Sequence, residues 1–311
     1  MSSVLSVRAH AKINLSLRVG PRRLDGFHEL RTVYQTLALH DVLQIARRRG
    51  TFALTCSSPD VPTDSSNLVF KAAQAVWRSL ARRGDPMDVS ISLRKRIPMQ
   101  AGLGGGSSDA AAALVALNRV WSAKLQAEDL IELAAALGSD VPFFLLGGTA
   151  LGLGRGEVVQ PLPDAPPHPI VLVRPDAGVS TAEAYGWLDA DPGGAAIAAA
   201  SSAVPWPGAI VNDLEPPVVR RRPAIGEARQ ALIAAGALAA GMTGSGSAVF
   251  GIFETRERAR AAQGHLARPG WAVILTRTLG RAEYSRRARP ETVQREGRAW
   301  LPRLARSRLI G

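Results

Sequence analysis

The sequence has little cysteine and lacks long apolar runs. Cys56 is the single cysteine, which excludes an internal disulfide and any metal cage built from cysteines. No stretch approaches the roughly 18 uninterrupted apolar residues that a membrane-spanning helix needs. The first residues lack the apolar core of a secretory signal, and an alternating segment begins almost at once. We therefore expect a cytoplasmic protein without a membrane partner.

Lysine is scarce as well. The basic residues are almost all arginine, and the lysines are Lys12, Lys71, Lys95 and Lys124. The formal net charge is +12, but the segment from Arg277 to the end supplies +7 of it. Clustered arginines can bind nucleic-acid phosphates without sequence preference, whereas a charged terminus is more often a solvated tail. We expect the solvated tail and do not expect nucleic acid as the partner.

The 311 residues have a globular composition, with 46% apolar and 21% charged residues. A chain of this length tends to divide its core between two domains. Alternating apolar residues predict strands, and apolar residues three or four positions apart predict helices. Strands are predicted near residues 13–19, through 30–57, and near 89–93, 170–173, 247–253 and 271–279. Helices are predicted near residues 67–83, 127–137, 224–236 and 255–267, and after the glycines at 102–106. Ser180 followed by Glu183 is a capping-box signature that predicts a further short helix, which carries Tyr185 and Trp187.

Two proline- and glycine-rich segments divide this pattern. Residues 162–169 are predicted to be a linker or long loop, and residues 193–209 an irregular surface loop. The pattern as a whole predicts an α+β protein in two lobes.

The strongest local signal is a glycine loop that opens into a helix. It reads Gly102-Leu103-Gly104-Gly105-Gly106-Ser107-Ser108. Glycines let backbone amides converge, and a helix N-terminus adds about half a positive charge, which together favour phosphate binding. The loop lacks the Gly-Lys-Ser/Thr of a Walker A motif and the third glycine of the dinucleotide fingerprint.

Other candidate residues are ambiguous by themselves. A second glycine cluster, Thr243-Gly244-Ser245-Gly246, is as consistent with a tight turn as with a ligand loop. Lys12 lies on a strand face where a lysine is usually solvated, and His28 lies beside a turn. Asp140 follows the helix that ends at Gly138, where a cap is as plausible as a catalytic base.

Taken in order, these pieces resemble the GHMP small-molecule kinases. The matching blocks are AKINLSL, DGFHELRTV, PMQAGLGGGSSDAAAAL, LGSDVPFF and MTGSGSAVF, and they cover roughly residues 8–280. AKINL with DGFHEL is most similar to those members that act on a cytidine diphosphate derivative of methylerythritol. The resemblance implies an ATP-binding lobe at residues 1–160 and a ferredoxin-like, substrate-binding lobe at residues 161–284, followed by an Arg-rich tail at residues 285–311.

The resemblance also implies which residues bind ATP and magnesium. The ATP phosphates would be wrapped by Pro98, Met99, Gln100, Ala101, Gly102, Leu103, Gly104, Gly105, Gly106, Ser107 and Ser108. Mg²⁺ is expected with ATP, and Ser107, Ser108 and Asp109 are candidate ligands by position alone. Mg²⁺ often keeps several waters and binds mainly through substrate phosphates, so its protein ligands are left open.

Catalytic and substrate-binding roles follow from the same resemblance. Asp140 would accept the proton of the substrate's C2 hydroxyl, and Lys12 would hold Asp140 and the developing negative charge in place. The cytidine end, polyol and phosphates would be held by Asn14, Phe27, His28, Thr181 and Tyr185, with Thr243 and Gly244 at the border of the site. The family motif usually reads DGYHEL, so Phe27 lacks a hydroxyl that the tyrosine would carry.

Two alternative functions remain consistent with the sequence. One is a GHMP kinase for another small alcohol, such as mevalonate or homoserine, although these have no base for Phe27, His28 and Tyr185 to recognise. The other is a nucleic-acid-binding protein that uses the basic tail on a non-catalytic scaffold, in which case removal of residues 285–311 would abolish its activity. The sequence predicts no oligomeric state.

Overall fold

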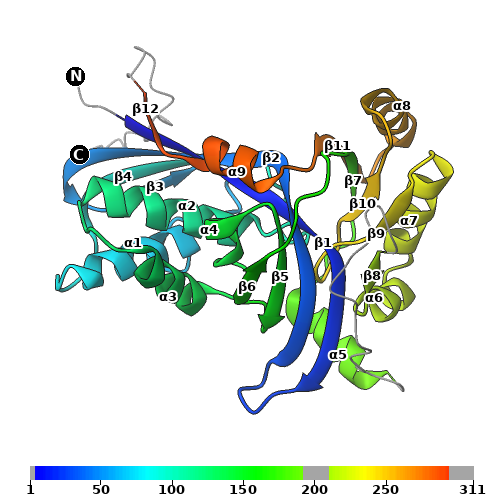
Figure 1. Ribbon diagram of the computed structural model, residues 1–311, viewed down its shortest axis with the longest axis horizontal. Helices are drawn as coiled ribbons and strands as arrows, with labels where there is room; N and C mark the ends of the chain where they lie inside the picture. The colour runs from blue at the N-terminus through cyan, green and yellow to red at the C-terminus, as the bar shows by residue number, and fades with distance from the viewer. Residues whose placement is uncertain (1–3, 192–209, 294–311) are drawn as a thin grey trace, which may run out of the picture.

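The computed structural model describes residues 4–191 and 210–293 (Figure 1). Two lobes lie on either side of a long, antiparallel pair of strands, β1 and β2. The first sheet contains β1 (Val4–Arg22), β2 (His28–Thr51), β3 (Ala53–Cys56), β4 (Met87–Arg94), β5 (Thr149–Gly154), β6 (Val158–Pro161), β8 (Val211–Asn212) and β12 (Glu291–Val293). Its order is β12-β1-β2-β4-β3, with β5 beside β2 and β6, and β8 beside β1.

Four helices complete the first lobe. They are α1 (Leu68–Ser79), α2 (Gly105–Val120), α3 (Ala127–Leu137) and α4 (Phe143–Leu146). Asn67 caps α1 through its side chain, which accepts from Val69 N at 2.8 Å. The alanine-rich face of α2 is buried against β1 and β2, together with Val76 of α1 and Leu43 of β2. This core holds the start of α2 in a fixed position beside the centre of β1.

The second lobe has a four-stranded antiparallel sheet in the order β11-β7-β10-β9. Its strands are β7 (Pro169–Pro175), β9 (Ala239–Met242), β10 (Val249–Ile252) and β11 (Trp271–Arg277), and its helices are α5 (Thr181–Ala190), α6 (Glu215–Arg221), α7 (Pro223–Ala234) and α8 (Arg256–Leu266). Helix α7 connects to β9 and α8 connects β10 to β11, which is the ferredoxin-like arrangement. The predicted two-lobed α+β fold is confirmed.

A shared core joins the lobes. Ile13 and Leu15 of β1 pack with Ile170 and Leu172 of β7 and with Phe250 of β10. The centre of β1 is therefore buried on both faces, although its sequence alternates like a half-exposed strand. The alternation correctly predicts a strand but underestimates its burial, because the covering surface comes from a distant part of the chain.

The start of the Arg-rich segment packs on the first lobe, so the expectation of a solvated tail is wrong for residues 281–293. Helix α9 (Arg281–Ala288) buries Tyr284, whose hydroxyl donates to Phe144 O. Gly147 leaves room for the tyrosine ring, since a Cβ there would lie 2.0 Å from it. Strand β12 then pairs antiparallel with the start of β1. Burial of this aromatic ring compensates for the poor apolar content of the helix.

The sequence predicts most elements within a few residues, including α3 at its observed bounds. It also predicts the capping box at Ser180 and Glu183 that begins α5. The sequence pattern does not predict strands β5, β6, β8, β9 and β12 or helices α4, α6 and α9. The loop predicted at 193–209 lies outside the described residues. The proposed domain limits remain predictions; the one at residue 160 falls within β6 and the one at residue 284 within α9.

Candidate active site

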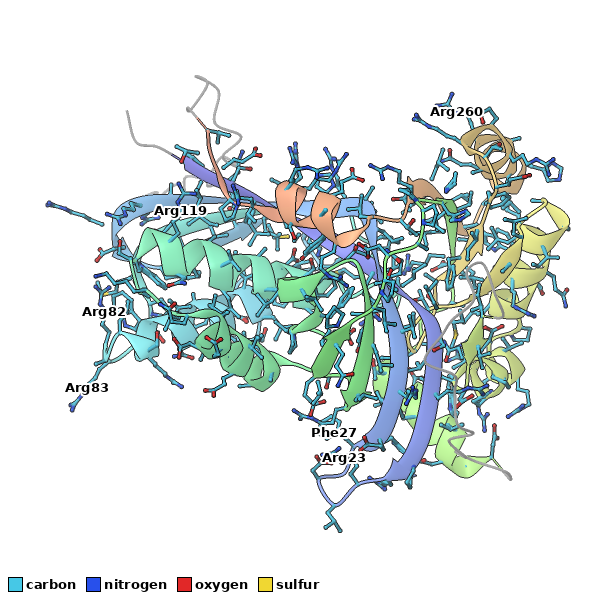
Figure 2. The ribbon with its side chains drawn as sticks, viewed as in Figure 1. Arg23, Phe27, Arg82, Arg83, Arg119 and Arg260 are labelled. Carbon is cyan, nitrogen blue, oxygen red and sulfur yellow. The ribbon has the colours of Figure 1, made fainter. Side chains whose placement is uncertain are left out.

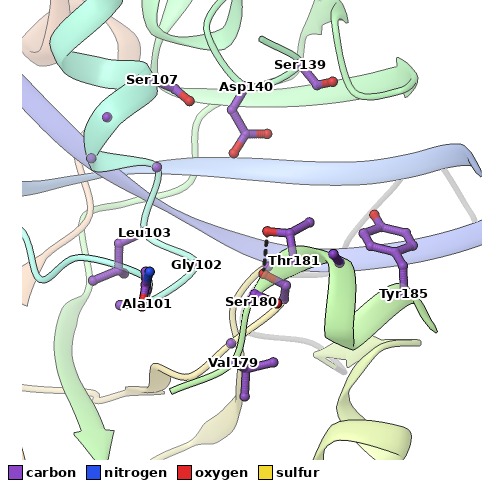
Figure 3. A pocket seen from close by; sticks show the side chains of 18 of the residues that line it. Ala101, Gly102, Leu103, Ser107, Ser139, Asp140, Val179, Ser180, Thr181 and Tyr185 are labelled. Atoms are coloured by element: carbon purple, nitrogen blue, oxygen red, sulfur yellow. Dashed lines mark hydrogen bonds between the residues drawn. The ribbon is translucent and has the colours of Figure 1, made fainter. Parts of the chain in front are cut away.

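A cleft of about 1160 Å³ lies where the glycine loop, β1 and α5 come together. This volume exceeds the roughly 300–1,000 Å³ of a pocket for one small ligand, so it suits two ligands side by side. The lining includes Lys12, Asn14, Phe27, His28, Pro98, Met99, Gln100, Ala101, Gly102, Leu103, Gly104, Gly105, Gly106, Ser107, Asp140, Thr181, Tyr185 and Gly244. In Figure 3 the Asp140 carboxylate points into the space between the glycine loop and α5.

Two predicted site residues do not line the cleft. Ser108 is buried and lines a second cavity of about 270 Å³ between α2 and α9. Thr243 is fully buried beneath the cleft, where its hydroxyl accepts from Asn14 N at 3.0 Å and lies 3.2 Å from Gly102 O. Thr243 thus supports the floor of the site by joining β1 to the glycine loop.

Lys12 and Asp140 form a close ion pair across the cleft floor. Lys12 Nζ lies 3.3 Å from Asp140 Oδ2 and donates to Asn14 Oδ1 at 2.7 Å. The lysine side chain is only 3% exposed, whereas the Asp140 side chain is 31% exposed. Burying an ammonium group is costly unless it is paired, so Lys12 is held at this position by its partners. The carboxylate keeps an open side toward the cleft.

The glycine loop has the geometry of an anion site. Gly104 takes a left-handed conformation (φ 68°) and α2 begins at the next residue. The N–H groups of the first turn of a helix have no partner within the helix, and Gly105 and Gly106 put no side chain over them. The backbone carbonyl of Leu103 accepts from Lys12 N at 3.0 Å, which fixes the loop to β1. The helix start therefore faces the cleft as a phosphate cradle.

The two glycine clusters pack directly against each other. A Cβ at Gly102 would lie 2.0 Å from Thr243 O, and one at Gly244 would lie 3.1 Å from Gly102 Cα. Ala248 N also donates to Ala101 O at 3.3 Å. The second cluster is therefore a close backbone support for the first, and Gly244 lines the cleft as well.

A buried charge cluster lies below the start of α2. Lys95 Nζ donates to Asp109 Oδ2 at 2.7 Å and also pairs with Asp41 Oδ2. Asp41 Oδ1 accepts from Ile97 N at 2.8 Å, which ties the strand before the loop to β2. Burial, aided by the charge on Asp41 and opposed by that on Lys95, raises the pKa of Asp109. Sequence reasoning does not bring these three residues together, because Asp41, Lys95 and Asp109 come from three separate segments.

The oxygen atoms near Asp109 are also of the kind that binds magnesium. Asp109 Oδ1 is buried without a hydrogen-bond partner in the described structure, and both Asp109 and Ser107 line the cleft. Carboxylate and hydroxyl oxygens are the donors that Mg²⁺ prefers. No group of three or more His, Cys, Asp or Glu side chains within the described ranges could form a metal site by itself. A magnesium ion held here would depend largely on nucleotide phosphates.

The far end of the cleft carries aromatic and polar groups. His28 stacks on Tyr185 with ring centroids 5.3 Å apart, and its Nε2 lies 2.9 Å from Asp189 Oδ1. Phe27 is 51% exposed, with the Arg155 guanidinium 5.0 Å above its ring. Burial, and then the charge of Asp140, raises the pKa of the Tyr185 hydroxyl. This end of the cleft therefore presents aromatic rings beside a histidine whose Nε2 is already paired with Asp189.

Comparison with known proteins decides the family. Two family models match in chain order, the GHMP kinases N-terminal domain at residues 67–148 and the GHMP kinases C-terminal model at residues 191–270. A relative from Pelotomaculum thermopropionicum is 42% identical over 89% of this chain and 98% of its own length. The chain belongs to the GHMP kinase family. The family resemblance read from the sequence motifs is thereby confirmed.

Relatives of this GHMP kinase carry a consistent name. The Pelotomaculum protein and one from Moorella thermoacetica, also 42% identical over 89% of the chain, are named 4-diphosphocytidyl-2-C-methyl-D-erythritol kinase. A solved structure of 4-(cytidine 5'-diphospho)-2C-methyl-D-erythritol kinase is 36% identical with a TM-score of 0.73 over 88% of this chain and 99% of that one. A homoserine kinase from Cytophaga hutchinsonii, 18% identical with a TM-score of 0.66 over 93% of this chain and 97% of that one, shares the fold.

One finding bears on the membrane expectation. Within residues 4–191 and 210–293, no helix has both the length and the apolarity required to cross a bilayer.

Proposed function

We propose that this GHMP kinase transfers the γ-phosphoryl group of ATP to the C2 hydroxyl of 4-diphosphocytidyl-2-C-methyl-D-erythritol. The products are the 2-phosphate and ADP, and the reaction belongs to isoprenoid precursor synthesis by the non-mevalonate route. Relatives of that name at 42% identity over most of the chain support the substrate. The observation that carries the mechanism is the Lys12–Asp140 pair, 3.3 Å apart on the floor of a cleft with a phosphate cradle on one side.

In the proposed reaction, Asp140 receives the proton from the C2 hydroxyl as that oxygen forms its bond to the γ-phosphorus. The bond between the γ-phosphorus and the bridging oxygen breaks, and ADP leaves. Lys12 holds the carboxylate and balances the negative charge that collects on the transferring group. Phosphoryl transfer needs little covalent help from the protein, so positioning and charge compensation provide most of the rate.

ATP is proposed to bind along residues 98–108, with its phosphates at the start of α2. Since Ser108 lines a different cavity, Ser107 is the better hydroxyl donor of the two. Mg²⁺ would neutralise phosphate charge when bound, and Asp109 and Ser107 would hold it from the protein side. Lys95 lies next to this position and keeps Asp109 in place through its 2.7 Å contact.

The cytidine end is assigned to the aromatic part of the cleft. His28 offers a donor or an acceptor to a cytosine edge, while Phe27 and Tyr185 offer ring faces. Replacement of tyrosine by Phe27 retains the ring, and the nearby Arg155 adds a cation above it. Thr181, whose hydroxyl lies 3.2 Å from Ser245 Oγ, and Asn14 would contact the polyol and phosphates. The cytoplasmic location expected from the sequence stays a prediction.

The base assignment is tested by Asp140→Asn. We expect kcat to fall by about 10²–10⁴, the usual scale for a general base, while the fold stays intact and the melting temperature drops because the buried Lys12 loses its charged partner. Asp85→Asn is the matched control, because Asp85 is exposed and lies outside the cleft. Near-normal turnover of Asp140→Asn would reject Asp140 as the base.

A further inference from the structure

Tyr34 is a buried tyrosine whose hydroxyl reaches the active-site carboxylate. It lies in β2, is 1% exposed, and donates to Asp140 Oδ1 at 2.9 Å. The hydroxyl also lies 3.5 Å from Gly156 O. By sequence pattern Tyr34 is an ordinary core position of an alternating strand, and neither the motifs nor the proposed reaction assigns it a role.

The fold makes specific room for this ring. A Cβ at Gly152 would lie 2.5 Å from ring atom Cε2, and a Cβ at Gly156 would lie 2.4 Å from the hydroxyl oxygen. Phe143 stacks on the other side, with ring centroids 4.7 Å apart and planes 28° from parallel. A tyrosine enclosed in this way has one position for its hydroxyl, and that position faces Asp140.

The contact leaves the carboxylate held at both oxygens. Tyr34 occupies a lone pair of Oδ1, and Lys12 lies 3.3 Å from Oδ2. An ionised carboxylate has about four acceptor positions, so positions remain for a substrate hydroxyl on the open side. Burial, reinforced by the charge of Asp140, raises the pKa of the Tyr34 phenol. The phenol therefore stays protonated and remains a hydrogen-bond donor at neutral and moderately alkaline pH.

We propose that Tyr34 is a positioning residue for phosphoryl transfer, which holds the Asp140 carboxylate in the orientation that receives the substrate proton. Lys12 alone would leave the carboxylate free to rotate about its Cβ–Cγ bond, because a single contact at Oδ2 fixes no plane. A second contact at Oδ1 from a rigid ring fixes the plane. This inference rests on the proposed role of Asp140 as the base.

The direct test is Tyr34→Phe, which removes the hydroxyl oxygen alone and keeps the ring between Phe143 and Gly152. We expect kcat to fall about tenfold, the scale of one hydrogen bond to a charged group, while KM for ATP and for the cytidine substrate stays within about twofold. Tyr284→Phe is the matched control. It also removes the hydroxyl of a buried tyrosine, but that hydroxyl donates to the backbone oxygen of Phe144. We expect it to lower the melting temperature by a similar amount and to leave kcat unchanged.

A double-mutant cycle separates positioning from general stability. In an Asp140→Ala background there is no carboxylate to orient, so Tyr34→Phe should have no further effect on the residual kcat. An unchanged kcat in Tyr34→Phe would overturn the inference, and so would the same tenfold loss in the Asp140→Ala background. A KM increase without a kcat change would also overturn it. If Asp140→Ala and Asp140→Asn themselves retained near-normal turnover, the base assignment would fail instead.

Discussion

The contact between the two glycine clusters makes Gly102→Ala a sharp test of how the site is built. Gly102 has a left-handed backbone (φ +70°), and an added Cβ would lie 2.0 Å from Thr243 O. A non-glycine residue in this conformation costs about 1–2 kcal/mol, and forcing a methyl group into a closely packed contact costs about 1–3 kcal/mol. The expected loss of unfolding free energy is therefore about 2–5 kcal/mol.

These costs translate into measurable changes. For 311 residues the entropy of unfolding is about 0.65 kcal/mol/K, so the melting temperature should fall by about 3–8 °C. The loss of turnover should be larger than partial unfolding alone would cause. The reason is that the methyl group displaces either the glycine loop or Thr243 and Asn14, which lie at the site itself. A misplacement of about 1 Å near reacting groups can cost about 10²-fold in rate.

Thermal unfolding and steady-state turnover of Gly102→Ala provide the assay, and Gly264→Ala provides the control. Gly264 lies in α8, where a Cβ would meet nothing within 4 Å and the backbone is not strained. Alanine there should raise the stability by up to about 1 kcal/mol and leave turnover unchanged. A wild-type melting temperature and turnover for Gly102→Ala would refute the close packing of the two glycine clusters.

Two further predictions concern histidines with different roles. His10 is fully buried against His40 and Tyr284; burial, and then the charge of His40, lowers the pKa of His10 to about 3. Between pH 6.5 and 3 the unfolded chain binds a proton that the folded chain excludes, so stability falls as the pH falls, by roughly 4–5 kcal/mol in total. Melting temperatures measured from pH 7 to 4 should decline less steeply in His10→Gln; an identical slope would contradict this origin. His28→Ala should raise KM for the cytidine substrate about tenfold or more without a comparable change in KM for ATP, and an unchanged KM would argue against cytosine recognition by His28.

The sequence predicted the parts of the site that depend on local structure. The glycine loop before α2 is recognisable because glycines, serines and a helix start follow one another in the chain. The capping box of α5 is recognisable for the same reason. Family resemblance added Lys12 and Asp140, which the structure brings to 3.3 Å.

The features that were missed depend on contacts between distant segments. By pattern Lys12 is a solvated strand lysine, but Gly104 and Gly244 of the two glycine clusters lie against its side chain, which is buried. The role of Tyr34 has no local signal, because nothing in the neighbouring sequence shows that its hydroxyl reaches a residue 106 positions away. The segment containing α9 looked like a tail because of its arginines, whereas a single tyrosine, Tyr284, fits against Gly147 and anchors it.

The most direct test of the central claim is ADP release from the wild-type protein with Mg-ATP and 4-diphosphocytidyl-2-C-methyl-D-erythritol, run beside mevalonate and homoserine. We predict ADP release with the cytidine substrate alone. Release with mevalonate or homoserine instead would leave the fold and the Lys12–Asp140 pair in place but contradict the assignment of Phe27, His28 and Tyr185. Binding of ATP without release of ADP from any of the three would contradict the claim that this cleft transfers phosphate to such an alcohol.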